Sequence, residues 1–249
     1  MFDIRKESRG AALSWGWFLV RPVVYLLCFW FAIGLGLRGA GNSGLEGLPP
    51  YFLWLACGII PWMFMREILS KGAAILRRKE DLATSVRFPL SCISSITVTA
   101  SMIVQLVLTV VLLVIYFACG MGLDIYLLQL PILLVLMFLF WDVFACMFSI
   151  LGAISKDVSQ IISVLSTPLF WISGVIFNIN SFPVEWVRPL FNLNPITFFV
   201  EGYRASLYYK TWIFHDVGAC IGFAIVFVIT LATTAFVYQR FARVVPDVL

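Results

Sequence analysis

Two residues of opposite charge, Glu201 and Arg204, lie three positions apart in an aromatic stretch near the carboxyl end of the chain. Residues at this spacing share one face of a helix, so the two side chains can form an ion pair. The stretch that holds them, Phe191–Lys210 (FNLNPITFFVEGYRASLYYK), is more polar than the long apolar segments on both sides of it. The chemistry expected here is electrostatic, because pairing neutralises two charges that are costly at the edge of a membrane.

Other residues that could do chemistry are scattered. Asp142 stands in the apolar run FLFWDVFACMF, where an ionisable side chain suggests either a functional site or a structural residue bonded to Gln105 or to an arginine of another helix. We favour the structural interpretation. His215 is the single histidine, and the six cysteines are isolated, with no CxxC spacing. No set of catalytic residues or metal ligands emerges, so the sequence gives poor support for an enzyme.

A cluster of charges lies in ILRRKEDLATSVRFP (residues 75–89). Its members are Arg77, Arg78, Lys79, Glu80 and Asp81. One interpretation is a basic loop that only fixes the orientation of the chain in a membrane. The other is a helix that seats in a groove of a separate ATPase, where the charges give complementarity and register. The phosphate-binding pattern GxxxxGK[ST] is absent from the 249 residues, so ATP would have to be bound by another polypeptide.

The composition identifies the environment that these residues occupy. Hydrophobic residues make up 62% of the chain and charged residues 12%, with a mean hydropathy of +1.00. Globular proteins carry about 25% charged residues, so this is the composition of a membrane protein. The net charge of +4 is small, and no soluble basic face is available for nucleic acid.

Six segments are apolar and long enough to span a bilayer, which takes about 20 residues. The sixth, Val158–Phe177, is the most polar and contains Pro168. The other five are Trp17–Leu37, Tyr51–Leu69, Ile96–Cys119, Leu127–Leu151 and Gly218–Tyr238. We read the amino-terminal apolar run as a retained span and not as a signal peptide.

The distribution of Lys and Arg predicts the orientation. Ten basic residues fall on the side that holds both termini, against four on the other side, so both termini are expected in the cytoplasm. The ten are Arg5, Lys6, Arg9, Arg77, Arg78, Lys79, Arg87, Lys156, Arg240 and Arg243, and the four are Arg38, Arg188, Arg204 and Lys210.

This orientation places the aromatic stretch outside, before the last span. Asn194 is a good helix cap and Pro195 suits the first helical position, so a helix should begin there. A shorter helix is expected before it, around Val184–Phe191, after Pro183. The pair could form a re-entrant hairpin or an aromatic belt at the membrane surface, and the residues alone leave both open.

Several segments together resemble the permease subunits of ABC type-2 polysaccharide exporters, which include the O-antigen, teichoic-acid and capsule transporters. The segment LNPITFFVEGYR is similar to the one before the last helix of that family. Further similarities follow in order along the chain, in GAALSWGWFLVRPVVYLLCFWFAIG, YFLWLACGIIPWMFMREIL, DLATSVRFPLSCISS and KDVSQIISVLSTPLFWISGVIF. Asp142 fits no motif of the family.

The resemblance implies an all-α fold in one domain (1–249), with six transmembrane helices, a re-entrant helical hairpin at about 183–210 and both termini cytoplasmic. It also implies a bacterial cytoplasmic-membrane homodimer that works with two copies of an ATPase, which binds ATP and Mg, to export a lipid-linked glycan. Arg77, Arg78, Lys79, Glu80 and Asp81 would couple to the ATPase. The outer gate and the glycan path would use Phe170, Trp171, Phe177, Asn194, Pro195, Phe198, Glu201, Tyr203 and Arg204. Flat aromatic faces suit a moving sugar polymer, although packing is the commoner role of any single aromatic residue.

Three other functions stay open at this point. The same architecture could export a drug, a lipid or a small metabolite. An intramembrane glycan-processing enzyme would need a catalytic group in a cavity, for which Asp142 is the one candidate. A membrane scaffold without transport is the third.

Overall fold

The computed structural model describes residues 16–29, 31, 51–80, 89–179, 188–242 and 244–245, and every regular element among them is helical. In chain order the elements are α2 (Gly16–Phe29), α3 (Tyr51–Lys71), η2 (Gly72–Ala74), α4 (Ile75–Arg78), α6 (Leu90–Ala118), η3 (Ile125–Leu128), α7 (Gln129–Ile154), α8 (Lys156–Ile172), α9 (Arg188–Asn192), α10 (Pro195–Arg204), the π-helical turn η6 (Ala205–Tyr209), η7 (Ile213–His215) and α11 (Val217–Phe241).

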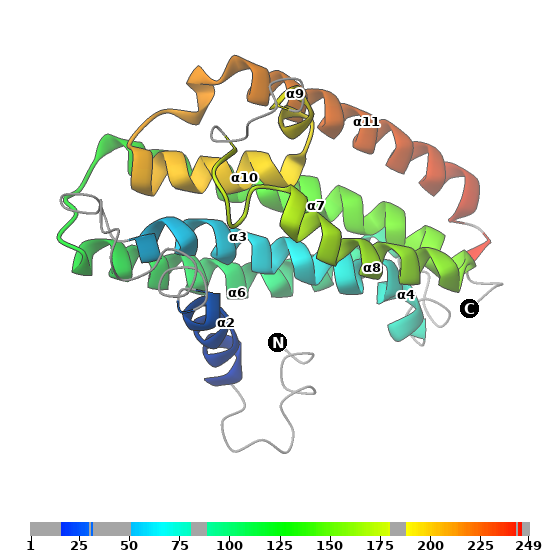
Figure 1. Cartoon of the computed structure of the whole chain (residues 1–249). Coiled ribbons are helices and arrows are strands. Elements are labelled where there is room, and N and C mark those ends of the chain that lie inside the picture. Colours follow the sequence, from blue (N-terminus) through cyan, green and yellow to red (C-terminus); the bar gives the residue numbers. More distant parts are fainter. Residues whose placement is uncertain are drawn as a thin grey trace.

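The long helices α3, α6 and α7 run side by side, and the axis of α10 lies along theirs (Figure 1). Within the described residues, four helical stretches are long and apolar enough to cross a membrane. They are Tyr51–Arg78, Leu90–Ala118, Ile125–Ile154 and Val217–Phe241. The bundle has two ends, named here the η3 end and the α4 end. The chain reverses between α6 and α7 at the η3 end, and between α7 and α8 at the α4 end.

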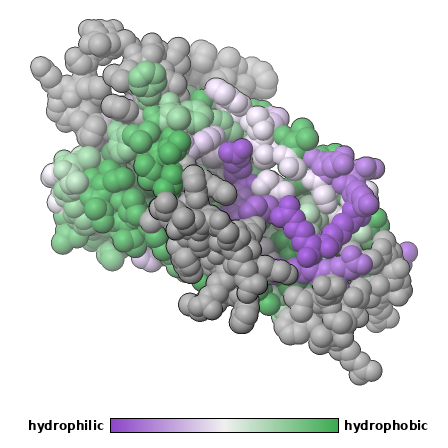
Figure 2. Space-filling model, turned by 90° about the horizontal axis from the view of Figure 1, so that it is seen from below, coloured by the Kyte–Doolittle hydropathy of each residue, from purple (hydrophilic) through white to green (hydrophobic). Residues whose placement is uncertain are grey.

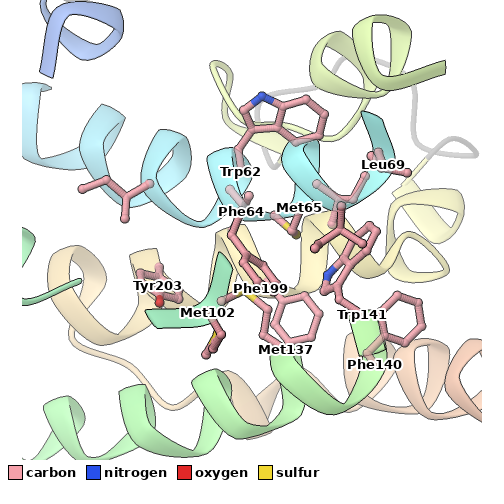
Figure 3. Packing of buried hydrophobic residues seen from close by; sticks show 14 of the residues in the cluster. Trp62, Phe64, Met65, Leu69, Met102, Met137, Phe140, Trp141, Phe199 and Tyr203 are labelled. Carbon is pink, nitrogen blue, oxygen red and sulfur yellow. The ribbon is translucent and has the colours of Figure 1, made fainter. Parts of the chain in front are cut away.

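Helix α3 forms the centre of the bundle. From Tyr51 to Met65 it is apolar on all sides, as a helix surrounded by protein should be, and it packs against α6, α8, α10 and α2. Its side chains meet those of α7 and α10 in a core that includes Trp62, Met65, Trp141 and Phe199 (Figure 3). Helix α11 lies at the periphery and leaves large apolar side chains such as Val228 and Phe236 exposed, which suits contact with lipid.

Two elements approach each other closely at the α4 end. A Cβ added to Gly152 of α7 would lie 1.9 Å from the carbonyl oxygen of Ala73 in η2. The Ser159 hydroxyl of α8 donates to the same carbonyl at 3.1 Å. The absence of a side chain at position 152 therefore allows η2 to approach α7, and the hydrogen bond from Ser159 holds η2 against α8.

Four of the six expected spans are recovered among the described residues, with changed boundaries. Helix α6 begins at Leu90, earlier than the expected Ile96, because the serine-rich turn SCISS is also helical. Helix α8 ends at Ile172 and not at Phe177, because Gly174 adopts φ +71° and closes the helix. With 17 residues, α8 is about 25 Å long and shorter than a hydrocarbon core of about 30 Å. The described part of the first expected span is α2, and residues 32–37 lie outside the described residues.

Candidate functional site

The segment that the sequence singled out begins at the expected cap. The Asn194 side chain accepts a hydrogen bond from the backbone N–H of Ile196 at 3.0 Å, and Pro195 occupies the first turn of α10. The Asn194 amide also donates to Ser173 Oγ at 2.8 Å, and the Thr197 hydroxyl donates to the Ser173 carbonyl at 3.1 Å. The predicted cap is confirmed, and it also ties the start of α10 to the end of α8.

Arg204 is fully buried at the other end of α10 and has partners on three elements. Its Nη1 donates to the carbonyl of Gly174 at 2.7 Å and to Glu201 Oε1 at 2.8 Å, and its Nη2 donates to the carbonyl of Val175 at 2.6 Å. The guanidinium also lies 3.5 Å from the centre of a Trp54 ring on α3. The predicted Glu201–Arg204 pair is confirmed, and we call this arrangement the Arg204 clamp.

The clamp provides hydrogen-bond donors for the carbonyls of Gly174 and Val175, which would otherwise be buried without a partner. Because α8 stops within the bundle, the carbonyls just beyond its end need donors, and Arg204 supplies them. Gly58 makes the contact possible, since a Cβ there would lie 2.5 Å from the Val175 oxygen and 2.8 Å from Arg204 Nη2. The sequence drew attention to Arg204 and Glu201 but gave no signal for Trp54 or the two carbonyls.

Two aromatic residues of α10 proposed for a glycan path are buried. Tyr203 is fully enclosed, and its hydroxyl bonds with Gln105 Nε2 at 3.2 Å and with Thr109 Oγ1 at 3.1 Å. Phe198 is 3% exposed and stacks on Phe223 of α11 at 4.4 Å between ring centres. In this conformation both rings connect α10 to its neighbours.

The aromatic residues expected near the end of α8 lie in different surroundings. Phe170 is buried against Trp62 and Phe29. Trp171 is exposed over 58% of its surface, and Phe177 lies 6.1 Å from Phe191 between ring centres.

A cavity of about 650 Å³ lies between α10, α9 and the start of α11. Two carboxylates, Glu201 and Asp216, and three aromatic residues, Phe198, Tyr209 and Trp212, are among its lining residues. This volume is within the range of small-molecule sites, about 300–1,000 Å³. The sequence did not single out Tyr209, Trp212 or Asp216 as candidates for a site.

At the η3 end an ion pair closes the connection after α10. Lys210, which adopts φ +53°, lies 2.7 Å from Asp124 Oδ2, and the Tyr116 hydroxyl donates to the same oxygen at 3.0 Å. The bonds from Lys210 and Tyr116 hold the pKa of the Asp124 carboxyl below its usual range.

The charged cluster at the α4 end differs from the clamp. Arg77 donates to the carbonyl of Ala153 at 3.0 Å, whereas Arg78 and Glu80 are exposed. Lys79 is half-buried, and Asp81 lies outside the described residues. Figure 2 shows hydrophilic residues gathered toward this end of the molecule, apart from the hydrophobic residues of the same face.

Asp142 does not have the partner that we expected. Its Oδ2 accepts a hydrogen bond from Ser95 at 3.0 Å, while Gln105 donates to Tyr203 instead. Asp142 belongs to a recess of about 470 Å³ between α6, α7 and α11, which Thr234 and Tyr238 also line. In the part of the chain that the structure describes, no three His, Cys, Asp or Glu residues come together as metal ligands. His215 is exposed in η7.

The sequence profile of the ABC-2 type transporter family matches residues 3–208, most of the chain. The chain belongs to the ABC-2 type transporter family. This ABC-2 permease is also similar to the O-antigen export system permease protein RfbA of Myxococcus xanthus, at 21% identity over 207 residues, which is 83% of this chain and 77% of the relative. The family assigns the protein to the membrane subunits of transporters, so the resemblance drawn from the sequence is confirmed.

Proposed function

We propose that this permease is the membrane subunit of an ATP-driven exporter that moves a lipid-linked polysaccharide across the bacterial cytoplasmic membrane. The similarity to an O-antigen export permease over 83% of the chain carries this proposal. O-antigen is a polymer of the required kind.

The proposed fold has six spans, with α2 and α8 contributing to the first and fifth. The segment of residues 183–210 is a re-entrant hairpin and forms the outer gate. Two contacts support a segment that enters the bundle and returns: Asn194 reaches the end of α8 inside the bundle, and Lys210 pairs with Asp124 at the η3 end. Between them, α10 packs on α3 and α7.

The α4 end faces the cytoplasm in this proposal, because it carries the excess of basic residues. There α4 docks with a separate ATPase that binds ATP and Mg. The exposed Arg78 and Glu80 support docking, since the fold leaves these charges at the surface. Gly152 allows η2 to approach α7 closely, and Arg77 of α4 donates to the Ala153 carbonyl of α7. Movement of α4 would therefore be transmitted to the bundle.

We also propose that two copies of the chain form the path between them. A two-fold dimer is the commonest symmetric assembly. Within one chain, the centre is filled by α3 and the side chains packed on it, so a single bundle leaves little room for a polymer. Trp171, which is exposed, would line the edge of that path in each copy.

Deletion of the gene in the source cell tests this function. We expect lipid-linked polysaccharide to accumulate inside and surface polysaccharide to be lost, with both restored by the wild-type chain. An unchanged amount of polysaccharide on both sides of the membrane would contradict the proposal, and a changed efflux of a drug or a lipid would then favour an ABC-2 exporter of small molecules.

A further inference from the structure

The cavity beside α10 has an unusual charge for a site on a basic chain. Its described lining contains two carboxylates, Glu201 and Asp216, and no Lys, Arg or His. Arg204 lies near, but its Nη atoms are committed to Glu201 and to two carbonyls.

Each carboxylate of the lining is held in place by one of its oxygens. Glu201 Oε1 accepts from Arg204 at 2.8 Å, and Asp216 Oδ1 caps α11 by accepting from the N–H of Ala219 at 3.0 Å. The second oxygen of each group can accept hydrogen bonds from a ligand, and a carboxylate has room for several. Fixed acceptors of this kind suit a ligand rich in hydroxyl donors.

The aromatic residues of the lining are held as well. The Tyr209 hydroxyl accepts from Trp54 Nε1 at 2.9 Å, and Trp212 packs on Tyr126 with ring centres 5.6 Å apart. The connection between them is pinned by Gln129, which donates to the Thr211 carbonyl at 2.7 Å and accepts from the Ile213 N–H at 2.9 Å. Tyr209 is exposed and Trp212 is half-buried, so their apolar surface is available to a ring with C–H faces.

We propose that this cavity binds an uncharged saccharide unit of the transported polymer and disfavours anionic units. The inference rests on the proposed export of a polysaccharide and adds the charge class of the sugar. Hydroxyl groups would donate to Glu201 and Asp216 while the ring lies against Tyr209 or Trp212. A uronate or phosphate group would meet Asp216 and the paired Glu201 with no basic side chain in the described lining to bind it, and like charges in contact are strongly unfavourable.

Two trisaccharides matched in ring, linkage and length test the charge preference: α-1,4-galactotriose, which is neutral, and α-1,4-trigalacturonic acid, which is anionic. Isothermal titration calorimetry with the purified full transporter in nanodiscs measures their affinities. We expect galactotriose to bind at least about tenfold more tightly, given the cost of like charges in contact. Equal or tighter binding of the anionic sugar, or no binding of either, would overturn the proposal.

Three variants sharpen this test. Asp216→Asn keeps a helix cap and removes one charge, so it should narrow the difference between the two sugars. Trp212→Leu should weaken the binding of both. The control is Glu67→Gln, which removes the same charge from a residue bonded to Lys71 on α3, outside the cavity, and should change neither affinity.

The variant Arg188→Gln, in α9, provides a further outcome that would contradict the proposal. If trigalacturonic acid binds and Arg188→Gln abolishes that binding, the cavity takes anions through Arg188. Accumulation of polysaccharide in the deletion strain is a separate measurement, so export can stand when this inference fails.

Discussion

Two clusters of charge in this permease look alike in sequence and differ in the structure. The Arg204 clamp and the charged cluster of residues 77–81, called here the α4 cluster, both combine arginine with acidic residues a few positions away along the chain. Arg204 is fully buried and bonded to Glu201 and two carbonyls. Arg78 and Glu80 of the other cluster are exposed.

The difference separates two uses of charge. Burial of a guanidinium is tolerated where a carboxylate and further acceptors bind its Nη atoms, and breaking such an arrangement leaves charges unpaired in a dry site. Exposed charges contribute little to stability, but they remain available to another protein. The clamp should therefore govern the fold, and the α4 cluster should govern coupling.

The largest effect is expected from Arg204→Met. The change leaves Glu201 and the carbonyls of Gly174 and Val175 without their donor, and loss of one partner from a buried pair costs about 3–5 kcal/mol. Thermal unfolding of the purified permease in detergent should show a marked fall in Tm. Glu201→Gln should cost less, because the carbonyl contacts of Arg204 persist.

A double-mutant cycle with Glu201→Gln and Arg204→Met sharpens this prediction. Since the two side chains are in contact, the double variant should lose less stability than the sum of the single variants. Strictly additive losses of stability would show that the ion pair contributes nothing. An unchanged Tm in Arg204→Met would contradict a stabilising role for the Arg204 clamp.

The second largest loss of stability is expected from a substitution at Gly58, the glycine that contacts the Arg204 clamp. Gly58→Ala would bring a Cβ to 2.5 Å from the Val175 oxygen, which is backbone and cannot move aside easily. Overpacking of this kind costs about 1–3 kcal/mol. Gly122→Ala is the matched control, because no atom lies within 4 Å of its added Cβ. Equal Tm values for the two variants would contradict the close approach of α3 and the end of α8.

Charge reversal at α4 should act on function alone. We expect Arg78→Glu, at an exposed residue, to change stability by less than about 0.5 kcal/mol, as surface substitutions usually do, and to reduce ATP-dependent export sharply. The measurements are Tm and surface polysaccharide in cells. Arg240→Glu, at an exposed residue of α11, is the control and should preserve export. Normal export by Arg78→Glu would disprove the proposed role of α4 in coupling.

The smallest effect is expected at the η3 end. The pKa of Asp124 is lowered in the folded chain, chiefly by the bond from Lys210. The stabilisation is therefore present above the unfolded pKa, about 3.9, and is lost as the pH falls through the folded value. Wild type should have a slightly higher Tm than Asp124→Asn at pH 7, and the difference should vanish in acid. A difference that grows in acid would reverse this assignment.

The sequence predicted what depends on near neighbours. The cap at Asn194 and the Glu201–Arg204 pair involve residues two and three positions apart, and both were predicted. The partners that complete the clamp come from positions 29 and 30 residues away, and Trp54 joins Tyr209 across 155 residues. Such contacts depend on where α8 ends and how α10 lies on α3, which no local pattern specifies.

The partner of Asp142 illustrates the same limit. The long apolar run placed this residue inside a spanning helix, but it could not show that Ser95 faces it and that Gln105 faces Tyr203. Residues on different helices meet according to the rotation of each helix, which the whole bundle determines. The ordered family motifs, by contrast, identified the ABC-2 permease without any knowledge of these contacts.

Transport in a reconstituted system tests the central claim most directly. The purified chain and its partner ATPase would be placed in proteoliposomes, with the ATPase facing the bath and fluorescent lipid-linked polysaccharide supplied in the bilayer. With ATP and Mg, we predict that the polysaccharide becomes protected from an added glycosidase, and that either protein alone gives no protection. Polysaccharide that stays fully digestible while the assembled complex hydrolyses ATP would contradict the assignment of this permease as a polysaccharide exporter.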